Sequence, residues 1–298
     1  MNRAIEDYLA KLRAALAGAD PATIQDAASD AEEHLTTALD LAIEENPGLP
    51  PEAAIENVIE TYGRPEEVAA AYKEMENMTP VAIAPLGNRN TKSRPHGFFG
   101  VFGDIRAYGA MLYMFLSLLT GCIYFTWVAT GLSLSAGLIV LIIGLPFMAA
   151  FLVTTRGMAL IEGRIVEGVL GVRMPRRLAF FRRDLGWWGG LKALFGDRTT
   201  WTGILYLILQ APLGIIYFTL AVGLITVSLS LVAIPVLTYV FDLPIHTTGH
   251  HAYYAPGWSM PLFVAGGILL LTATLHVARG IGSLHGRYAK KMLMKSEQ

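Results

Sequence analysis

The sequence predicts an all-α protein in which a small acidic domain of four helices precedes a membrane bundle of four spanning helices. Of its 298 residues, 53% are hydrophobic and 16% are charged, and the mean hydropathy is +0.46. A soluble domain of this length is usually less apolar and richer in charge. The charges also divide after Asn77. Residues 1–77 hold 5 Lys or Arg against 17 Asp or Glu, a net of −12, whereas residues 78–298 hold 18 against 7, a net of +11. We therefore expect an acidic head, residues 1–77, followed by a basic membrane body.

The head has the residue spacing of four amphipathic helices. Apolar residues recur every three or four positions over 5–16 and again over 24–43, which places them on one face of each helix. Breaks between helices are expected at Gly18, Asn46-Pro47-Gly48 and Tyr62-Gly63-Arg64-Pro65. The first residues lack an apolar stretch with a small-residue cleavage site, so we expect no export signal.

Three short motifs cover most of the head: Tyr8-Leu9-x-x-Leu12, Glu32-Glu33-His34-Leu35 and Tyr62-Gly63-x-Pro65-Glu66-Glu67-Val68-Ala69-x-x-Tyr72. They resemble the HAAS domain, a helical signalling domain associated with helix-turn-helix regulators. The resemblance implies that the head acts in signalling. Neighbouring helix positions point about 100° apart, so the Glu-Glu-His stretch cannot converge on one metal ion and is expected to be a solvated face. A net charge of −12 repels phosphate, which excludes nucleic acid, so the head is expected to bind a protein or to have no partner.

Residues 78–104 are expected to form a flexible linker, because prolines and glycines interrupt them repeatedly. Residues 105–200 are expected to form the first membrane hairpin, with spans at 108–132 and 135–155. At about 1.5 Å per residue, each run is long enough to cross a hydrocarbon core of about 30 Å. Arg156 is expected to end the second span.

Residues 201–298 are expected to form the second membrane hairpin, with spans at 201–224 and 261–277 and a further apolar piece at 225–241. If that piece also crossed, the basic tail would lie on the opposite side from the basic stretch 156–198, contrary to the positive-inside rule. We therefore expect four spans, with 225–241 as a re-entrant or outer-leaflet segment. An outer loop follows at 242–260, and both termini are expected to be cytoplasmic in a bacterial inner membrane.

The body contains an internal repeat. Residues 113–126 align with 206–219 at an offset of 93, and Arg156-Gly157 and Gly163-Arg164 recur 123 positions later as Arg279-Gly280 and Gly286-Arg287. Both copies would run from inside to outside and back. We therefore expect two parallel hairpin repeats related by an axis along the membrane normal.

Four segments of the body can be compared with a known family: Gly144-Leu145-Pro146, Asp197-Arg198-Thr199-Thr200-Trp201, Tyr206 and Pro212-Leu213-Gly214. Over residues 105–292 the body resembles the sensor domain of bacterial signalling proteins. The resemblance implies that the body perceives a signal, and it supplies no ligand-binding residues. No kinase module follows Lys295, so we expect no phosphotransfer output from this chain.

The outer loop is one candidate site. Closely spaced imidazoles can share a metal ion, and their charge changes near pH 6.5, so the loop is a candidate metal or pH sensor. Pro244 and Gly249 favour the alternative, a solvated loop without a ligand. The candidate residues are Asp242, His246, His250 and His251. We expect no cofactor.

The inner loop interleaves cations with aromatic residues. This pattern is typical of a helix that lies in an anionic lipid interface. The alternative is that these cations receive the acidic head. The interface residues are Arg173, Arg176, Arg177, Arg182, Arg183, Trp187, Trp188 and Lys192.

The motifs of catalysis are missing from the sequence, which has no phosphate-binding glycine loop, nucleophile elbow or His-Glu-x-x-His. Residues 108–155 and 201–241 contain no Asp, Glu, Lys or Arg, which argues against ion-coupled transport. We expect a non-enzymatic inner-membrane signalling protein that couples a membrane or outer ligand to a cytoplasmic or membrane protein partner. A homo-oligomer is compatible with this expectation. The alternative is an accessory or permease-like subunit that handles a lipid or small apolar solute within a larger complex.

Overall fold

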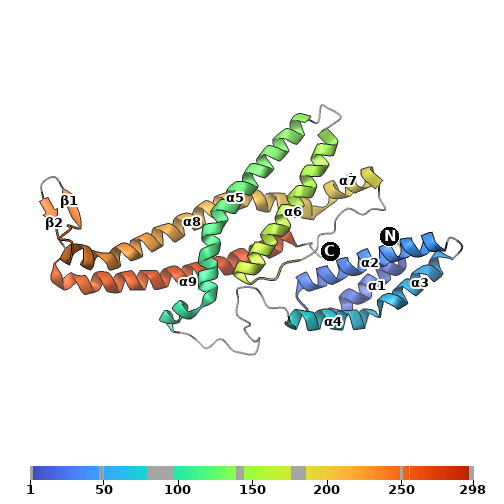
Figure 1. Cartoon of the computed structure of the whole chain (residues 1–298), viewed down its shortest axis with the longest axis horizontal. Helices are drawn as coiled ribbons and strands as arrows, with labels where there is room; N and C mark the ends of the chain where they lie inside the picture. Colours follow the sequence, from blue (N-terminus) through green and yellow to red (C-terminus); the bar gives the residue numbers. More distant parts are fainter. Residues whose placement is uncertain are drawn as a thin grey trace.

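Over the residues that it describes, the computed structural model is predominantly helical, with one short β-hairpin (Figure 1), which confirms the all-α prediction. It describes residues 3–46, 48, 50–78, 97–138, 144–175, 186–248, 251–254 and 256–294. In chain order the elements are α1 (Arg3–Ala15), α2 (Pro21–Glu45), α3 (Pro51–Tyr62), α4 (Pro65–Met78), the 3-10 helix η1 (Phe98–Gly103), α5 (Ile105–Leu138), α6 (Gly144–Leu170), α7 (Gly186–Gly196), α8 (Arg198–Tyr239), β1 (His246–Thr248), β2 (His251–Tyr253), the 3-10 helix η3 (Gly257–Ser259) and α9 (Met260–Leu293).

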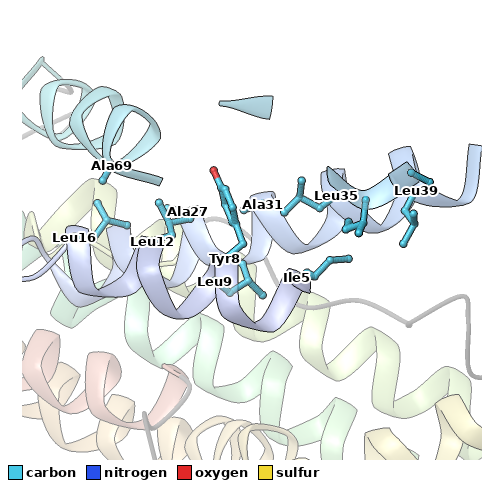
Figure 2. Packing of buried hydrophobic residues seen from close by; sticks show 12 residues of the cluster. Ile5, Tyr8, Leu9, Leu12, Leu16, Ala27, Ala31, Leu35, Leu39 and Ala69 are labelled. Atoms are coloured by element: carbon cyan, nitrogen blue, oxygen red, sulfur yellow. The ribbon is translucent and has the colours of Figure 1, made fainter. Parts of the chain in front are cut away.

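The four helices of the head pack around one apolar core. Leu12 of α1 and Ala31 of α2 are fully buried, and Ala69 of α4 reaches the same cluster (Figure 2). The side chain of Asp20 caps α2 by accepting a hydrogen bond of 2.9 Å from the backbone N–H of Ala22. The amphipathic spacing therefore predicted both the helices and the faces that they bury.

Tyr8 ties α1 to the turn between α3 and α4. Its ring is 4% exposed and its hydroxyl donates to the carbonyl oxygen of Gly63 at 2.9 Å. Gly63 has a φ of +107°, a region that favours glycine. Burial, followed by the nearby Tyr62, Glu66 and Glu67, raises the pKa of Tyr8 to about 12.

We expect the head to lose stability as the pH rises from about 10 to about 12. Tyr8 ionises near pH 10 in the unfolded chain but near pH 12 in the folded head, so the unfolded state releases its proton first. Below pH 10 this contribution is fully present. Chemical denaturation at a series of pH values would test it, with Tyr8→Phe as the matched variant. An equal alkaline slope in both proteins would contradict the prediction.

Among the residues that the structure describes, four helices are long and apolar enough to cross a membrane, as predicted: Ile105–Leu138, Gly144–Leu170, Arg198–Tyr239 and Gly257–Leu293. The helix does not end at Arg156, the predicted end of the second span, because α6 begins at Gly144 and continues to Leu170. The helix continues past Arg156 because the guanidinium of that residue is paired with Asp197 at 2.6 Å.

Residues 225–241 do not form a re-entrant segment, and their predicted place in the outer leaflet stays a prediction. α8 is one helix from Arg198 to Tyr239 and contains both Pro212 and Pro235. Proline removes one backbone donor, but helices in membranes tolerate it where neighbouring groups satisfy the freed carbonyl. At 42 residues, or about 63 Å, α8 is longer than the roughly 30 Å hydrocarbon core.

The α5–α6 hairpin crosses the α8–α9 hairpin, and their tips point in different directions (Figure 1). The crossing between α5 and α8 is close because Gly121 and Gly214 lie in it. A Cβ added to Gly121 would lie 2.6 Å from the carbonyl oxygen of Gln210 and 2.9 Å from the Cα of Ala211, and one added to Gly214 would meet the carbonyl oxygen of Ser117. Any larger residue would force the two helices apart.

Candidate functional site

A cluster of buried polar side chains lies where the two hairpins cross. We call it the core polar cluster. Glu162, Tyr206 and Gln210 are fully buried, and Tyr113 and His285 are 1% exposed. Buried polar side chains in a membrane bundle need partners, because neither water nor lipid supplies them. The cluster draws on all four spans and consists of Tyr113 and Tyr124 from α5, Glu162 from α6, Tyr206, Gln210 and Tyr217 from α8, and His285 from α9.

The carboxylate of Glu162 accepts hydrogen bonds from four side chains. Oε1 accepts from the hydroxyl of Tyr113 at 2.7 Å, and from the hydroxyl of Tyr206 and Nε2 of Gln210 at 3.2 Å each. Oε2 accepts from the hydroxyl of Tyr124 at 3.1 Å. Both oxygens of this buried carboxylate are therefore satisfied by donors from other helices.

His285 lies opposite Glu162 across the same two tyrosines. Its Nε2 is 2.6 Å from the hydroxyl oxygen of Tyr113 and 3.0 Å from that of Tyr206. Its Nδ1 is 3.3 Å from the hydroxyl of Tyr217. Tyr113 and Tyr206 thus bridge an acidic side chain on α6 to an imidazole on α9.

The cluster is built from corresponding positions of the two hairpins. Tyr206 follows Tyr113 by 93 residues, the offset of the internal repeat, and His285 follows Glu162 by 123 residues, the second offset. Each also lies eight residues from a helix end: Tyr113 from Ile105, Tyr206 from Arg198, Glu162 from Leu170 and His285 from Leu293. The four residues therefore occupy corresponding positions of the two hairpins.

Two ion pairs between the hairpins are also formed by residues at equivalent positions of the internal repeat. Arg156 lies 2.6 Å from Asp197, and Arg279 lies 3.1 Å from Asp104. Asp197 follows Asp104 by 93 residues and Arg279 follows Arg156 by 123. Each aspartate also accepts from a backbone N–H at the start of its helix, α5 or α8. Each pair therefore fixes the start of a helix in one hairpin to a helix of the other.

The head contacts the body through α9. The ammonium nitrogen of Lys290 donates to both carboxylate oxygens of Asp20 at 2.8 Å. The side chain of Lys290 is 24% exposed and that of Asp20 is 22% exposed. Lys290 follows His285 by five residues on the same helix. One helix therefore carries both a member of the core polar cluster and the contact with the head.

The outer residues predicted as a metal or pH sensor do not form a metal site in the part of the chain that the structure describes. Asp242 is exposed, with a φ of +50°. His246 and His251 lie in β1 and β2, so the expected loop is a hairpin over these residues, while His250 lies outside the described residues. No group of three or more His, Cys, Asp or Glu that could hold a metal ion occurs among the described residues.

The predicted lipid-interface residues are described only in part. Arg173 is partly exposed just after α6, and Lys192 is exposed on α7, the helix that also carries Trp187 and Trp188. Four further residues, Arg176, Arg177, Arg182 and Arg183, lie outside the described residues. Contact of this segment with anionic lipid, or with the head, stays a prediction.

Glu162 and His285 were not predicted as site residues. The expected end of the span at Arg156 placed Glu162 in an inner loop, whereas the structure places it in the bundle core. A signal was available, because the offset of 123 that relates Gly163 to Gly286 also relates Glu162 to His285. Paired polar residues at equivalent repeat positions would have indicated a shared site.

The fold and the buried site define a polytopic helical membrane protein with an N-terminal helical domain. A family model described as "Putative sensor" matches residues 113–293, and a HAAS model matches residues 7–71. The first match covers more than half of the chain, so the protein belongs to the "Putative sensor" family. Both resemblances inferred from the sequence are confirmed. The comparisons with curated proteins and with solved structures found no match.

Proposed function

We propose that this sensor protein passes a change at the core polar cluster along α9 to the head, which then alters its contact with a cytoplasmic protein partner. The contact between Asp20 and Lys290 carries the proposal. It is five residues from His285, or about 7.5 Å along the helix axis, so a small displacement of the cluster end of α9 moves Lys290 as well.

The strength of this contact suits a reversible switch. A partly exposed ion pair contributes on the order of 1 kcal/mol or less, so a modest shift of α9 is enough to release it. A ligand or modification can shift a two-state equilibrium only by its difference in affinity for the two states. Because the contact between Asp20 and Lys290 is weak, a small difference in affinity between the two states is enough to break it.

The head supplies the output surface of the proposed switch. Its net charge of −12 favours a partner with a basic surface and predicts an interaction that weakens as salt rises. The HAAS match supports a signalling role and is not to an enzyme family. We place the head, with both chain ends, in the cytoplasm of a bacterium.

The contact can be removed from either side without removing the cap of α2. Asp20→Asn keeps a good N-cap but loses the charge, and Lys290→Gln removes the cation. Lys291→Gln is the matched control, because Lys291 is the exposed neighbour. In lipid nanodiscs we expect amide hydrogen exchange at the start of α2 to be faster in Asp20→Asn and Lys290→Gln than in the unchanged protein. The exchange rate in Lys291→Gln should be unchanged.

Partner recovery tests the output. The first two variants should change the amount of a regulatory protein recovered from native membranes in mild detergent, whereas Lys291→Gln should not. Equal recovery with all three variants would remove the proposed coupling. Recovery of transporter subunits in place of a regulator would favour the permease-like alternative.

A further inference from the structure

We propose that the core polar cluster is a proton-binding site, in which a single proton is shared between Glu162 and His285 through Tyr113 and Tyr206, and that gain or loss of this proton is the signal. The inference rests on the proposed function for its output, but the site itself stands on the geometry of the cluster. Each of the two tyrosine oxygens lies within hydrogen-bond distance of both Oε1 of Glu162 and Nε2 of His285.

Counting hydrogens shows that the cluster has two complete arrangements. Each tyrosine hydroxyl has one hydrogen and can donate to one acceptor at a time. With Glu162 ionised and His285 neutral, one tyrosine donates to the carboxylate and the other to Nε2. With His285 protonated, Nε2 donates to a tyrosine oxygen and both tyrosines donate to Glu162. The two arrangements differ by rotation of hydroxyl hydrogens and by one proton.

The remaining groups around the pair fit either arrangement. Tyr124 and Gln210 donate to Glu162 in both. Nδ1 of His285 carries a hydrogen in both and donates it to the hydroxyl oxygen of Tyr217. Tyr288 stacks against Tyr206 and meets the ring of His285 edge-on, with centroids 5.6 Å apart. The hydrogen-bonding contacts that the structure gives Glu162 and His285 are thus with tyrosines and Gln210, which add no charge to the pair.

Binding of the proton changes the net charge of the buried pair Glu162 and His285. With the proton, the pair is neutral as a whole, and without it the cluster has a charge of −1 at full burial. An unpaired charge in an apolar interior is costly, so loss of the proton favours a rearrangement that admits a cation or water. Because Tyr113 and Glu162 belong to the first hairpin and Tyr206 and His285 to the second, any such rearrangement changes how the two hairpins fit together.

The test follows the nitrogen resonances of histidine in the full-length protein in lipid vesicles, as the pH is varied. His285→Gln identifies the resonance of His285, and His276→Gln is the control, since His276 is exposed and bonded to the carbonyl oxygen of Phe98. We expect the His285 resonance to change in one pH step, and Glu162→Gln to displace that step by at least one pH unit while leaving the other histidines unchanged.

Single tyrosine variants keep the test decisive if Glu162→Gln does not fold. Tyr113→Phe and Tyr206→Phe each remove one of the two bridges and retain both the acid and the imidazole, so each should also displace the step. A His285 resonance that does not change with pH, or that ignores all three variants, would overturn the proton site. If the variants shift the pH step of His285 but amide exchange at the start of α2 does not depend on pH, the proton site is supported and the proposed coupling to the head is contradicted.

Discussion

Replacing Glu162 with Leu is expected to lower the free energy of unfolding by about 3 kcal/mol, the lower end of the range for removing one partner of a buried charged network. The substitution removes the acceptor of Tyr124 and one acceptor each of Tyr113, Tyr206 and Gln210 in a fully buried site. Gln210 keeps its 2.9 Å bond to the hydroxyl of Tyr113, and one tyrosine can still donate to His285. The loss is limited to the lower end because hydrogen bonds between membrane helices are individually weak.

Two further variants test whether the destabilisation by Glu162→Leu comes from the lost hydrogen bonds or from replacing any glutamate with leucine. Glu162→Gln keeps the size of the side chain and one acceptor oxygen, so its cost should be nearer 1 kcal/mol. Glu60→Leu, at an exposed position on α3, should have almost no effect. Unfolding in mixed micelles of increasing denaturing detergent would measure all three. A cost for Glu162→Leu as small as that for Glu60→Leu would show that the cluster does not hold the spans together.

Gly121→Ala is expected to destabilise the bundle by about 2 kcal/mol, within the usual range for overpacking a close contact. The new methyl group would lie 2.6 Å from the carbonyl oxygen of Gln210, a backbone atom that cannot move without displacing α8. Because the side chain of Gln210 donates to Glu162, separating α5 from α8 also disturbs the core polar cluster. Gly214→Ala should act in the same way from the other helix.

Gly223→Ala provides the matched control on α8. A Cβ at Gly223 would meet no atom within 4 Å, so the substitution should be neutral or should stabilise the helix by up to about 1 kcal/mol through its higher propensity. The same unfolding assay applies, with the ellipticity of each variant as a check on folding. Equal stability of Gly121→Ala and Gly223→Ala would contradict the close crossing of α5 and α8.

The position of Glu162 shows where prediction from the sequence stopped. Hydropathy measures whether a stretch of chain can enter lipid, and a stretch with Arg156 and Glu162 scores as a loop. In the structure both residues belong to α6, because Asp197 pairs with the first and four donors satisfy the second. These partners come from other helices and are separated by many residues in the chain. Hydropathy averaged over neighbouring residues contains no information on such distant partners.

The re-entrant alternative for 225–241 was wrong for a related reason. Pro235 predicts a break when a helix is considered alone, and the charge rule then required a segment that did not cross. The structure keeps the four crossings by extending α8 to Tyr239, beyond the length that a bilayer needs. The number of helices that could cross was thus predicted correctly over the described residues, while the length of α8 was not.

The sequence by itself determined the acidic helical head, the four apolar helices, the offsets of 93 and 123 and the two family resemblances, because each is a property of spacing and composition along the chain. Only the tertiary structure decided that Tyr113, Glu162, Tyr206 and His285 meet, and that Asp20 reaches Lys290. Burying a charge depends on donors and acceptors brought by other helices, and these are fixed by packing in three dimensions.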